Sequence, residues 1–246
     1  MSEQNNHSTV ENTTTGLNHR KLLMWAFLGS DCMFFASLIA TYLVYRGKSV
    51  TGPEPIDLFS IPVTSVSTFV LLMSSMSMVL AYAALTKGNL KVFRVWMLST
   101  AIMGMTFLGF QVFEFRDFTV NHVKIGCEEN NAKYTELENK FSSQQKSDYK
   151  KQCSEGKKEA DIEFGMTPRT NLFGTTFFVL TGFHGAHVTL GVIWLLSLFF
   201  YSFKRGAVSA DRHLDVDLAA LYWHFVDIVW IVIFTVVYLF GVYEGF

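Results

Sequence analysis

Five long apolar stretches with few charged residues dominate the pattern of this chain. They cover residues 22–45, 59–85, 92–115, 172–203 and 216–240. A helix needs about 20 apolar residues to cross roughly 30 Å of hydrocarbon, and each stretch is long enough to do so. The pattern therefore predicts an all-α membrane protein with five transmembrane helices.

The polar segments divide the chain around these helices. Residues 1–20 are rich in Asn, Thr and Ser and predict a disordered tail. Because no basic region precedes a short apolar stretch there, we expect no cleavable signal peptide. Helices one to three occupy residues 21–118, and helices four and five occupy residues 171–246. A long charged extracytoplasmic loop, residues 119–170, is predicted between them.

Basic residues are shared unevenly between the two sides of the membrane. The opposite side from the N-terminus, apart from the long loop, has only Arg46 and Lys48. The N-terminal side carries Arg20, Lys21, Lys87, Lys91, Arg94, Lys204, Arg205 and Arg212. Because Lys and Arg near helix ends stay on the cytoplasmic side, we expect the N-terminus inside and the C-terminus outside.

The composition narrows the function classes. Half of the residues, 50%, are hydrophobic and only 17% are charged, which disfavours a disordered chain and an ordinary soluble enzyme. The formal charge of -1 leaves no positive excess to neutralise phosphates. No nucleic-acid partner is therefore expected.

The connection between helices three and four, residues 116–170 in full, balances its basic and acidic residues. Connections of this length usually have a function or an internal structure. Tyr134, Leu137 and Phe141 stand at helical spacing and indicate a short amphipathic helix. A solvated insertion is the simpler interpretation, and docking of an extracytoplasmic partner is the alternative.

Two of the three cysteines, Cys127 and Cys153, lie in this loop. The charge pattern places the loop in an oxidising compartment, where a disulfide between them can form. Two unrelated thiols remain the alternative, because two cysteines alone carry no spacing signature. Cys32 lies within the first helix, and we expect it to be an apolar packing residue.

Polar side chains inside the predicted helices are the candidates for chemistry, since such groups usually face the bundle interior. They are Asp31, Gln111, Glu114, His184, His187, His224 and Asp227. Six of them form three pairs with a spacing of three residues, so each pair can point inward from one helix face. All except the Gln111/Glu114 pair fall near the bilayer midplane, where three helices bring polar groups to a similar depth.

Three interpretations of these residues compete. A metal centre is chemically plausible, but no Glu-x-x-His pair repeats on two helices and no close cysteine pair occurs, so we expect no metal site. A small polytopic transporter with a His/Asp relay is the second, although no inverted repeat is visible. The third is a buried hydrogen-bond network in a structural subunit. Gly182 and Gly185 beside His184 favour it, because glycine permits close helix approach.

The second helix adds to this third interpretation. It carries a stripe of small residues that lets another helix approach closely. The stripe consists of Ser74, Ser77, Ala81 and Ala84.

Four segments of the chain form a recognisable set. Residues 174–188, GTTFFVLTGFHGAHV, and residues 222–230, YWHFVDIVW, resemble the two signature segments of subunit III of the haem-copper oxidases, as in cytochrome c oxidase. Residues 30–35, SDCMFF, are similar to the carboxylate-bearing helix of that family. Residues 111–115, QVFEF, are similar to its Gln-x-x-Glu-aromatic segment.

The resemblance is to the five-span form of the family, which lacks the first two of seven helices. His213 and Asp217 fit the family's His-x-x-x-acid spacing ahead of the last signature segment. Asp31 stands where the family usually has Glu, and the loop is far longer than the usual connection. The five-span form indicates a bacterial plasma membrane rather than the mitochondrial inner membrane.

What the resemblance implies is an accessory subunit of a terminal oxidase that couples oxygen reduction to proton translocation. Such a subunit has no catalytic residues of its own and binds neither haem nor copper, which lie in partner subunits. Subunit I is the expected main partner, with subunit II and others in the complex. In the family this subunit supports proton uptake and durability, and its cleft holds phospholipids and has been proposed as an oxygen path. The electron donor, a cytochrome c or a quinol, is a property of other subunits.

The resemblance also suggests residue roles. Asp31 is the candidate for supporting proton uptake or for reaction with a carbodiimide, and hydrogen bonding to His184 or His224 is its alternative role. The long loop is a candidate docking site for a cytochrome c domain or a neighbouring respiratory complex. The candidates for lipid or intersubunit contacts, with hydrogen bonding inside the chain as the alternative, are Glu114, His213, Asp217, Trp223 and His224.

Overall fold

The computed structural model describes most of the chain. The described residues are 18–46, 48, 61–120, 122–127, 132–163, 165–169, 171–204, 208 and 213–240. The tail expected at the N-terminus therefore lies outside the described residues, apart from its last three positions, as do residues 241–246 at the other end.

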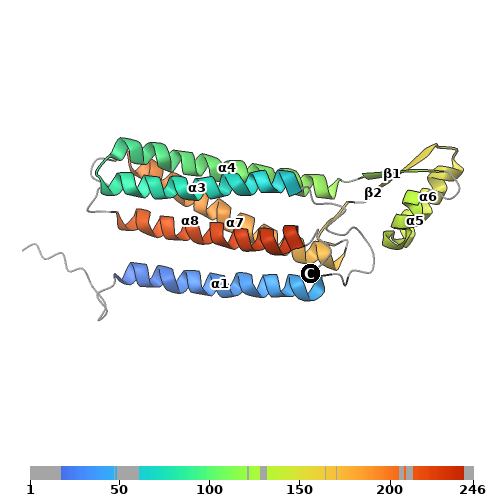
Figure 1. Cartoon of the computed structure of the whole chain (residues 1–246), viewed down its shortest axis with the longest axis horizontal. Coiled ribbons are helices and arrows are strands. Elements are labelled where there is room, and N and C mark those ends of the chain that lie inside the picture. The colour runs from blue at the N-terminus through green and yellow to red at the C-terminus, as the bar shows by residue number, and fades with distance from the viewer. Residues whose placement is uncertain are drawn as a thin grey trace, which may run out of the picture.

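Five long helices lie side by side along the long axis of the molecule (Figure 1). They are α1 (His19–Tyr45), α3 (Ile61–Thr86), α4 (Leu90–Thr119), α7 (Leu172–Tyr201) and α8 (Leu214–Ile233), which continues into the π-helical segment η2 (Phe234–Leu239). Each is long and apolar enough to cross a membrane. The prediction of five transmembrane helices is confirmed.

The helix ends differ from the ends of the apolar stretches because capping, not hydrophobicity, sets them. Asn18, Asn89 and Asn171 precede α1, α4 and α7, and each side chain accepts a hydrogen bond from a backbone N–H of the first turn. Accordingly α1 and α4 begin before the predicted spans. Conversely, α7 stops short of residue 203 because Ser202 caps it, and the Arg94 guanidinium holds the Ser202 carbonyl at 2.6 Å.

Small residues bring α3 close to its neighbours. The predicted stripe is buried along its whole length, at Ser74, Ser77, Ala81 and Ala84. The Ser77 hydroxyl donates to the Trp96 carbonyl of α4 at 3.1 Å, and the Ser74 hydroxyl accepts from the Trp223 indole of α8 at 3.0 Å. The stripe therefore packs α3 against α4 and α8 together.

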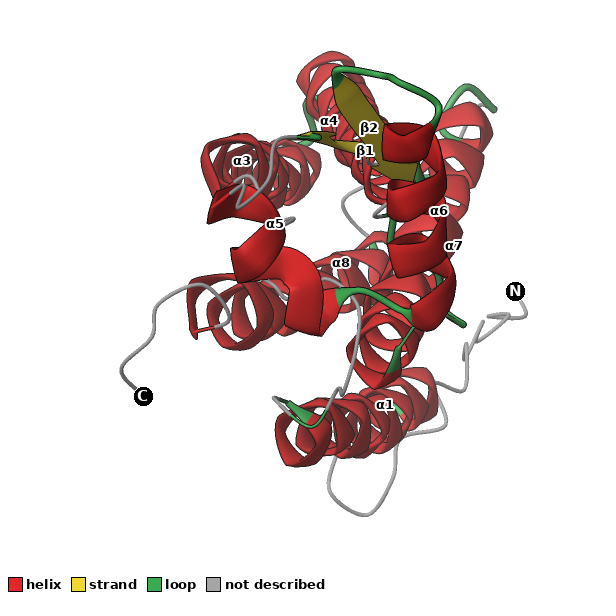
Figure 2. Ribbon diagram, turned by 90° about the vertical axis from the view of Figure 1, so that its right-hand side faces the viewer, coloured by secondary structure: helices red, strands yellow, loops and turns green. Residues whose placement is uncertain are grey.

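Helix α1 lies at the edge of the bundle, next to α7 and α8 (Figure 2). It buries one narrow stripe, at Met24, Leu28, Phe35 and Tyr42. Most of the remaining side chains of the helix are exposed, and that of Cys32 is one of them. The prediction that Cys32 is a packing residue is therefore wrong, because a helix with a single contact stripe leaves most of its circumference uncovered.

The long connection folds into a small module rather than a solvated loop. Its elements are β1 (His122–Gly126), α5 (Ala132–Leu137), the 3₁₀ turn η1 (Glu138–Lys140), α6 (Ser143–Ser154) and β2 (Glu159–Glu163). The strands pair antiparallel, with His122 opposite Glu163 and Gly126 opposite Glu159. The module buries its own apolar cluster, made of Ile125, Leu137, Phe141, Ala160 and Ile162. The predicted short amphipathic helix is confirmed only as far as Tyr134 and Leu137 in α5, because a 3₁₀ turn follows and Phe141 has extended backbone.

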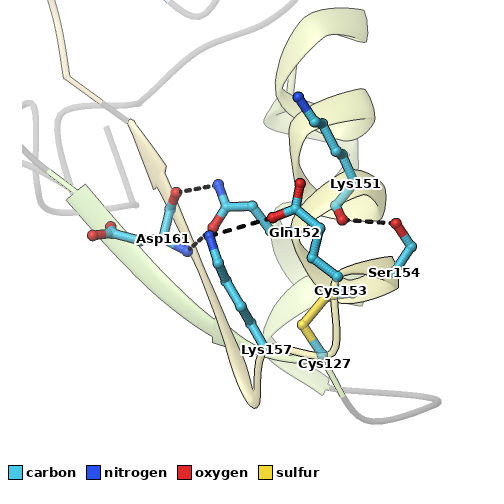
Figure 3. A network of polar contacts seen from close by, with 8 residues as sticks. Cys127, Lys151, Gln152, Cys153, Ser154, Lys157 and Asp161 are labelled. Atoms are coloured by element: carbon cyan, nitrogen blue, oxygen red, sulfur yellow. Dashed lines mark hydrogen bonds and ion pairs between the residues drawn. A yellow bond between two sulfur atoms is a disulfide. The ribbon is translucent and has the colours of Figure 1, made fainter.

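Helix α6 is clamped across β2 by two glutamines spaced seven residues apart. The Gln152 amide bonds both the N–H and the carbonyl of Asp161 (Figure 3). The Gln145 amide donates to the Glu163 carbonyl. A disulfide joins Cys127, directly after β1, to Cys153 in the last turn of α6. These side-chain bonds satisfy strand groups that a two-stranded sheet would otherwise leave at its edge.

The module stands beyond the ends of the transmembrane helices, connected to them by the two strands (Figure 1). The chain leaves α4 for the module and returns from it toward α7 at one place, which we call the neck. There the Met166 N–H donates to the Phe118 carbonyl at 2.7 Å. Within the module α6 packs on β2. The bundle and the module thus have separate apolar cores.

Candidate functional site

Asp31 and His187 form a half-buried pair between α1 and α7. The His187 Nε2 lies 3.4 Å from the Asp31 Oδ2, and each side chain is 16% exposed. The partner of Asp31 is therefore His187, not His184 or His224. The other ring nitrogen of His187, Nδ1, lies 2.7 Å from the Phe183 carbonyl and must carry a proton to bond it. The Asp31 Oδ2 is itself buried and makes no hydrogen bond within the described residues, so its relation to His187 is a close approach of 3.4 Å.

His184 is fully buried and packs as an aromatic ring. It stacks on Trp230 with a centroid distance of 4.8 Å and meets the edges of Phe107 and Phe35. Neither of its ring nitrogens has a hydrogen-bond partner within the described part of the chain. The Trp230 indole is fixed in turn by a 3.0 Å hydrogen bond to the Thr68 hydroxyl. His184 thus sits at the centre of the contact among four helices.

Gln111 fastens α4 to α7. Its amide donates to the Thr181 carbonyl at 2.8 Å. The amide passes so close to Gly185 that a Cβ there would lie 2.7 Å from its oxygen, so Gly185 is required for this approach. Gly182 has open space around it instead. Only one of the two glycines beside the histidine pair therefore serves close packing.

Glu114, the other member of the Gln111 pair, is buried among hydroxyl groups. It accepts a hydrogen bond from Thr64 on α3 and one from the Tyr238 hydroxyl at 3.4 Å. Tyr238 belongs to η2, so one carboxyl group joins α3, α4 and the π-helical end of the last helix. The arrangement stabilises the end of the bundle that is nearest the module.

Trp223 is the best-enclosed side chain of the last signature segment. Besides its bond to Ser74, its ring lies against two glycines on opposite helices. A Cβ on Gly104 of α4 would come within 2.6 Å of the ring, and one on Gly191 of α7 within 2.9 Å. The tryptophan therefore occupies space that these glycines leave open.

His224 bonds a hydroxyl group of α3, whereas Asp227 on the same helix face does not share it. The Ser75 Oγ lies 2.6 Å from the His224 Nδ1, and the buried Asp227 Oδ1 has no hydrogen-bond partner among the described residues. Asp227 is buried, whereas His224 is half-buried. In two of the three pairs predicted from the sequence, only one member is fully buried in the bundle. These members are His184 of the His184/His187 pair and Asp227 of the His224/Asp227 pair.

His213 and Asp217 lie at the opposite end of the bundle from Glu114. Asp217 bonds the Lys21 ammonium at 2.8 Å and so ties α8 to α1. His213 stands before the first residue of α8, with its ring 6.0 Å from that of Tyr82. Neither side chain joins the groups near the middle of the membrane.

The structure therefore divides the candidates among several helix contacts instead of one continuous network. Sequence reasoning missed the partners Thr64, Ser75 and Tyr238, whose hydroxyl groups are common in membrane helices and carry no spacing signal. Within the described ranges, no three His, Cys, Asp or Glu side chains gather closely enough to hold a metal ion.

In the module, burial raises the pKa of the Tyr134 phenol, and the Glu138 carboxylate adds to the effect. The Tyr134 ring stacks on that of Tyr149 at 4.1 Å.

Comparison with known proteins agrees with the resemblance of the sequence to subunit III of the haem-copper oxidases. The family model described as cytochrome c oxidase subunit III matches residues 159–242. The chain is 32% identical to cytochrome c oxidase subunit 3 of Alkalihalophilus pseudofirmus over 235 residues, covering 96% of this chain and 93% of the relative. It is 30% identical to cytochrome c oxidase subunit 3 of Bacillus subtilis over 234 residues, covering 95% and 92%.

A relative named as a quinol oxidase subunit is similar over nearly the same length. The chain is 29% identical to a probable quinol oxidase subunit 3 of Staphylococcus saprophyticus over 240 residues, covering 97% of this chain and 98% of the relative. The matched region of the family model contains both signature segments, with the buried His184 and Trp223. The chain therefore belongs to the subunit III family of the haem-copper oxidases, as its sequence predicts.

Proposed function

We propose that this chain is the accessory subunit III of a terminal oxidase in a bacterial plasma membrane. It packs against the catalytic subunit I of a complex that also contains subunit II. Haem and copper belong to those partners, and the chain has no catalytic centre of its own. The family membership and the five apolar helices support this proposal.

The Asp31–His187 pair carries the more specific part of the proposal, which is support of proton uptake. Carboxyl and imidazole groups are the side chains that proton relays in membrane proteins use, and here one of each lies within 3.4 Å of the other. Its 16% exposure leaves it in contact with the surface of the bundle, where a proton can arrive. Ionisable groups within membrane helices usually mark such pathways.

The test uses the purified oxidase complex reconstituted in vesicles. Asp31→Asn and His187→Gln should slow proton uptake to the same degree, because each removes one half of the same pair. Ser30→Ala changes the exposed neighbour of Asp31 and is the matched control. Haem content and subunit composition should remain those of the wild type. Uptake at the wild-type rate in both variants would refute the role of the pair.

The second part of the proposed function is docking of a soluble partner outside the cytoplasm, and we assign it to the module. Its disulfide suits an oxidising compartment, which agrees with the orientation expected from the basic residues. The exposed side chains among its described residues are polar and carry both charge signs, and complementary charges guide the encounter of two proteins. A cytochrome c domain or a neighbouring respiratory complex is the proposed partner.

Deleting residues 125–160 tests this docking. Lys124 and Asp161 face each other in the strand register, so an Asn-Gly turn can join them directly. The shortened subunit should retain the haem-containing complex and its oxygen consumption with an artificial electron donor. The soluble partner should no longer co-purify, and its unchanged co-purification would count against the module as the docking site.

Phospholipid contacts are proposed for the end of the bundle where α1 and α8 begin. Arg20 and Lys21 stand there in front of the apolar surface of α1, and Asp215 and Asp217 orient them. Each cation is paired with a carboxylate but keeps part of its surface exposed, 66% for Arg20 and 36% for Lys21, so both can also bond a lipid phosphate. Replacing both by Gln should reduce the phospholipid that mass spectrometry detects in the purified complex.

A further inference from the structure

A hollow of about 340 Å³ opens between α3 and α4, beside the turn that joins the two helices. Two facing stripes line it, Leu80, Ala83, Ala84 and Lys87 from α3 and Val92 and Trp96 from α4. One turn further into the bundle, the hydrogen bond of Ser77 to the Trp96 carbonyl draws the two helices together. Because alanine side chains are short, the helices leave space next to the turn.

The turn holds Lys87 at the mouth of this hollow. Gly88 has a φ of 75°, a conformation that residues with a side chain rarely adopt. The Asn89 N–H donates to the Ala84 carbonyl at 2.9 Å, and the Asn89 side chain accepts from the Val92 N–H. The turn is therefore tight, and the backbone of Lys87 stays next to the space that its side chain lines.

The positive charge at this turn is not balanced by carboxylates of the same two helices. Lys87 and Lys91 are exposed, and residues 61–113 contain no Asp or Glu. The two carboxylates that the first turn of α8 holds at this end of the bundle pair with Arg20 and Lys21 of α1 instead. The end of the α3–α4 pair therefore attracts an anion.

The hollow lies at the depth where lipid headgroups meet the acyl chains. Leu80 stands six residues before the last residue of α3, Thr86, and Trp96 stands six residues after the first residue of α4, Leu90. Each is thus about 9 Å from the end of its helix. Leu80 and Val92 are 37% and 39% exposed, so the hollow opens sideways toward the membrane. Apolar walls beneath a cation suit an amphiphile whose hydrocarbon chain lies below an anionic group.

We propose that this hollow binds an anionic phospholipid, with one acyl chain between the two stripes and the phosphate beside Lys87 and Lys91. A zwitterionic lipid fits less well, because its headgroup brings a cation of its own next to the two lysines. The site is separate from the lipid contacts of Arg20 and Lys21, since α8 lies between α1 and α3 (Figure 1). It requires only that the chain lies in a membrane, so it goes beyond the oxidase function proposed above.

Native mass spectrometry of the full-length chain in mild detergent can compare bound phosphatidylglycerol with phosphatidylcholine of the same acyl chains. The wild type should retain phosphatidylglycerol preferentially. Lys87→Gln should weaken that binding about fivefold and leave phosphatidylcholine unchanged, because it removes one cation beside the phosphate. Ala83→Leu fills the hollow and should weaken the binding of both lipids.

The control for the charge is Lys204→Gln, which removes an exposed lysine at the same end of the bundle but outside the hollow. It should bind both lipids as the wild type does. Equal retention of the two lipids by the wild type, or equal losses of phosphatidylglycerol in Lys87→Gln and Lys204→Gln, would overturn the anionic site.

Photo-crosslinking in intact membranes identifies the occupant without changing a charge. A photoreactive residue at Leu80 should form adducts enriched in anionic phospholipid. The control position is Val79, which is 52% exposed at the same depth of α3 but does not line the hollow. It should label lipids in the proportions of the bulk membrane. The same proportions at Leu80, or a cross-link from Leu80 to another protein chain, would overturn the proposal.

Discussion

Removing the disulfide of the module should unfold the module and leave the membrane helices intact. The perturbation is the double substitution Cys127→Ser and Cys153→Ser, which avoids leaving one free thiol. The apolar cluster of the module has only five buried residues, and the module spans only residues 122–163. Its length is close to the roughly 40 residues below which domains usually need a disulfide, a metal or a partner to remain folded.

The magnitude follows from the length of the closed loop. Cys127 and Cys153 are 26 positions apart, and the chain-entropy relation assigns about 3.5 kcal/mol at 25 °C to a loop of that length. Loss of that free energy raises the unfolded population of the module by roughly 300-fold. The hydrogen bonds of Gln145 and Gln152 to β2 remain, but neither constrains the unfolded chain.

Limited trypsin digestion of the detergent-solubilised complex measures this population, because the module contains many lysines that are cleaved only when it opens. The double variant should be cut within residues 133–158 about two orders of magnitude faster than the oxidised wild type. Wild-type protein treated with reductant should match the double variant, and reductant should not affect the variant. Cleavage of the double variant at the wild-type rate would show that the small core alone holds the module.

Two further predictions concern the bundle. Gly104→Ala places a methyl group against the rigid indole ring of Trp223 and should lower the free energy of unfolding by about 1–3 kcal/mol. Gly109→Ala, on the same helix with open space around it, should leave the free energy of unfolding unchanged. Thermal denaturation in detergent compares the two variants. Asp217→Asn should cost about 0.5–1 kcal/mol at low salt and less at high salt, because its ion pair is partly buried. Asp215→Asn, from an exposed pair, should have no measurable effect on the same denaturation curve, and equal losses in both variants would contradict the dependence on burial.

The sequence predicts the bundle well because the bilayer imposes a single requirement on it. Each transmembrane helix must be apolar over a fixed length, and that length can be counted. The small-residue stripe through Ser77 also predicts close packing, since small side chains on one helix face have few other uses in a membrane. Helix ends were less predictable, as caps such as Asn89 lie outside the apolar pattern and depend on a local side-chain bond.

The partners of the polar residues could not be predicted, since spacing on one helix says nothing about rotation of the next. Asp31 meets His187 rather than His184 because the stripe of α1 through Phe35 sets which side of α7 it faces. The fold of the module was hidden for another reason. Its apolar cluster is spread over the two strands, α5 and Phe141 after the 3₁₀ turn, so only the segment around Leu137 shows a helical period.

The neck of the module explains how the bundle accommodates such a large insertion. The Met166 N–H bonds the Phe118 carbonyl, so the chain that leaves α4 and the chain that returns toward α7 are fastened together before the strands begin. Gly165 makes this approach possible, since a Cβ there would lie 2.3 Å from the Thr119 carbonyl oxygen. The family model matches from residue 159, the first residue of β2, onward. An insertion whose two ends are already adjacent adds little loop-closure entropy, so the module can vary without disturbing the helices. Gly165→Val should accordingly loosen both the neck and the end of α4, whereas changes at the tip of the module should leave the bundle unaffected.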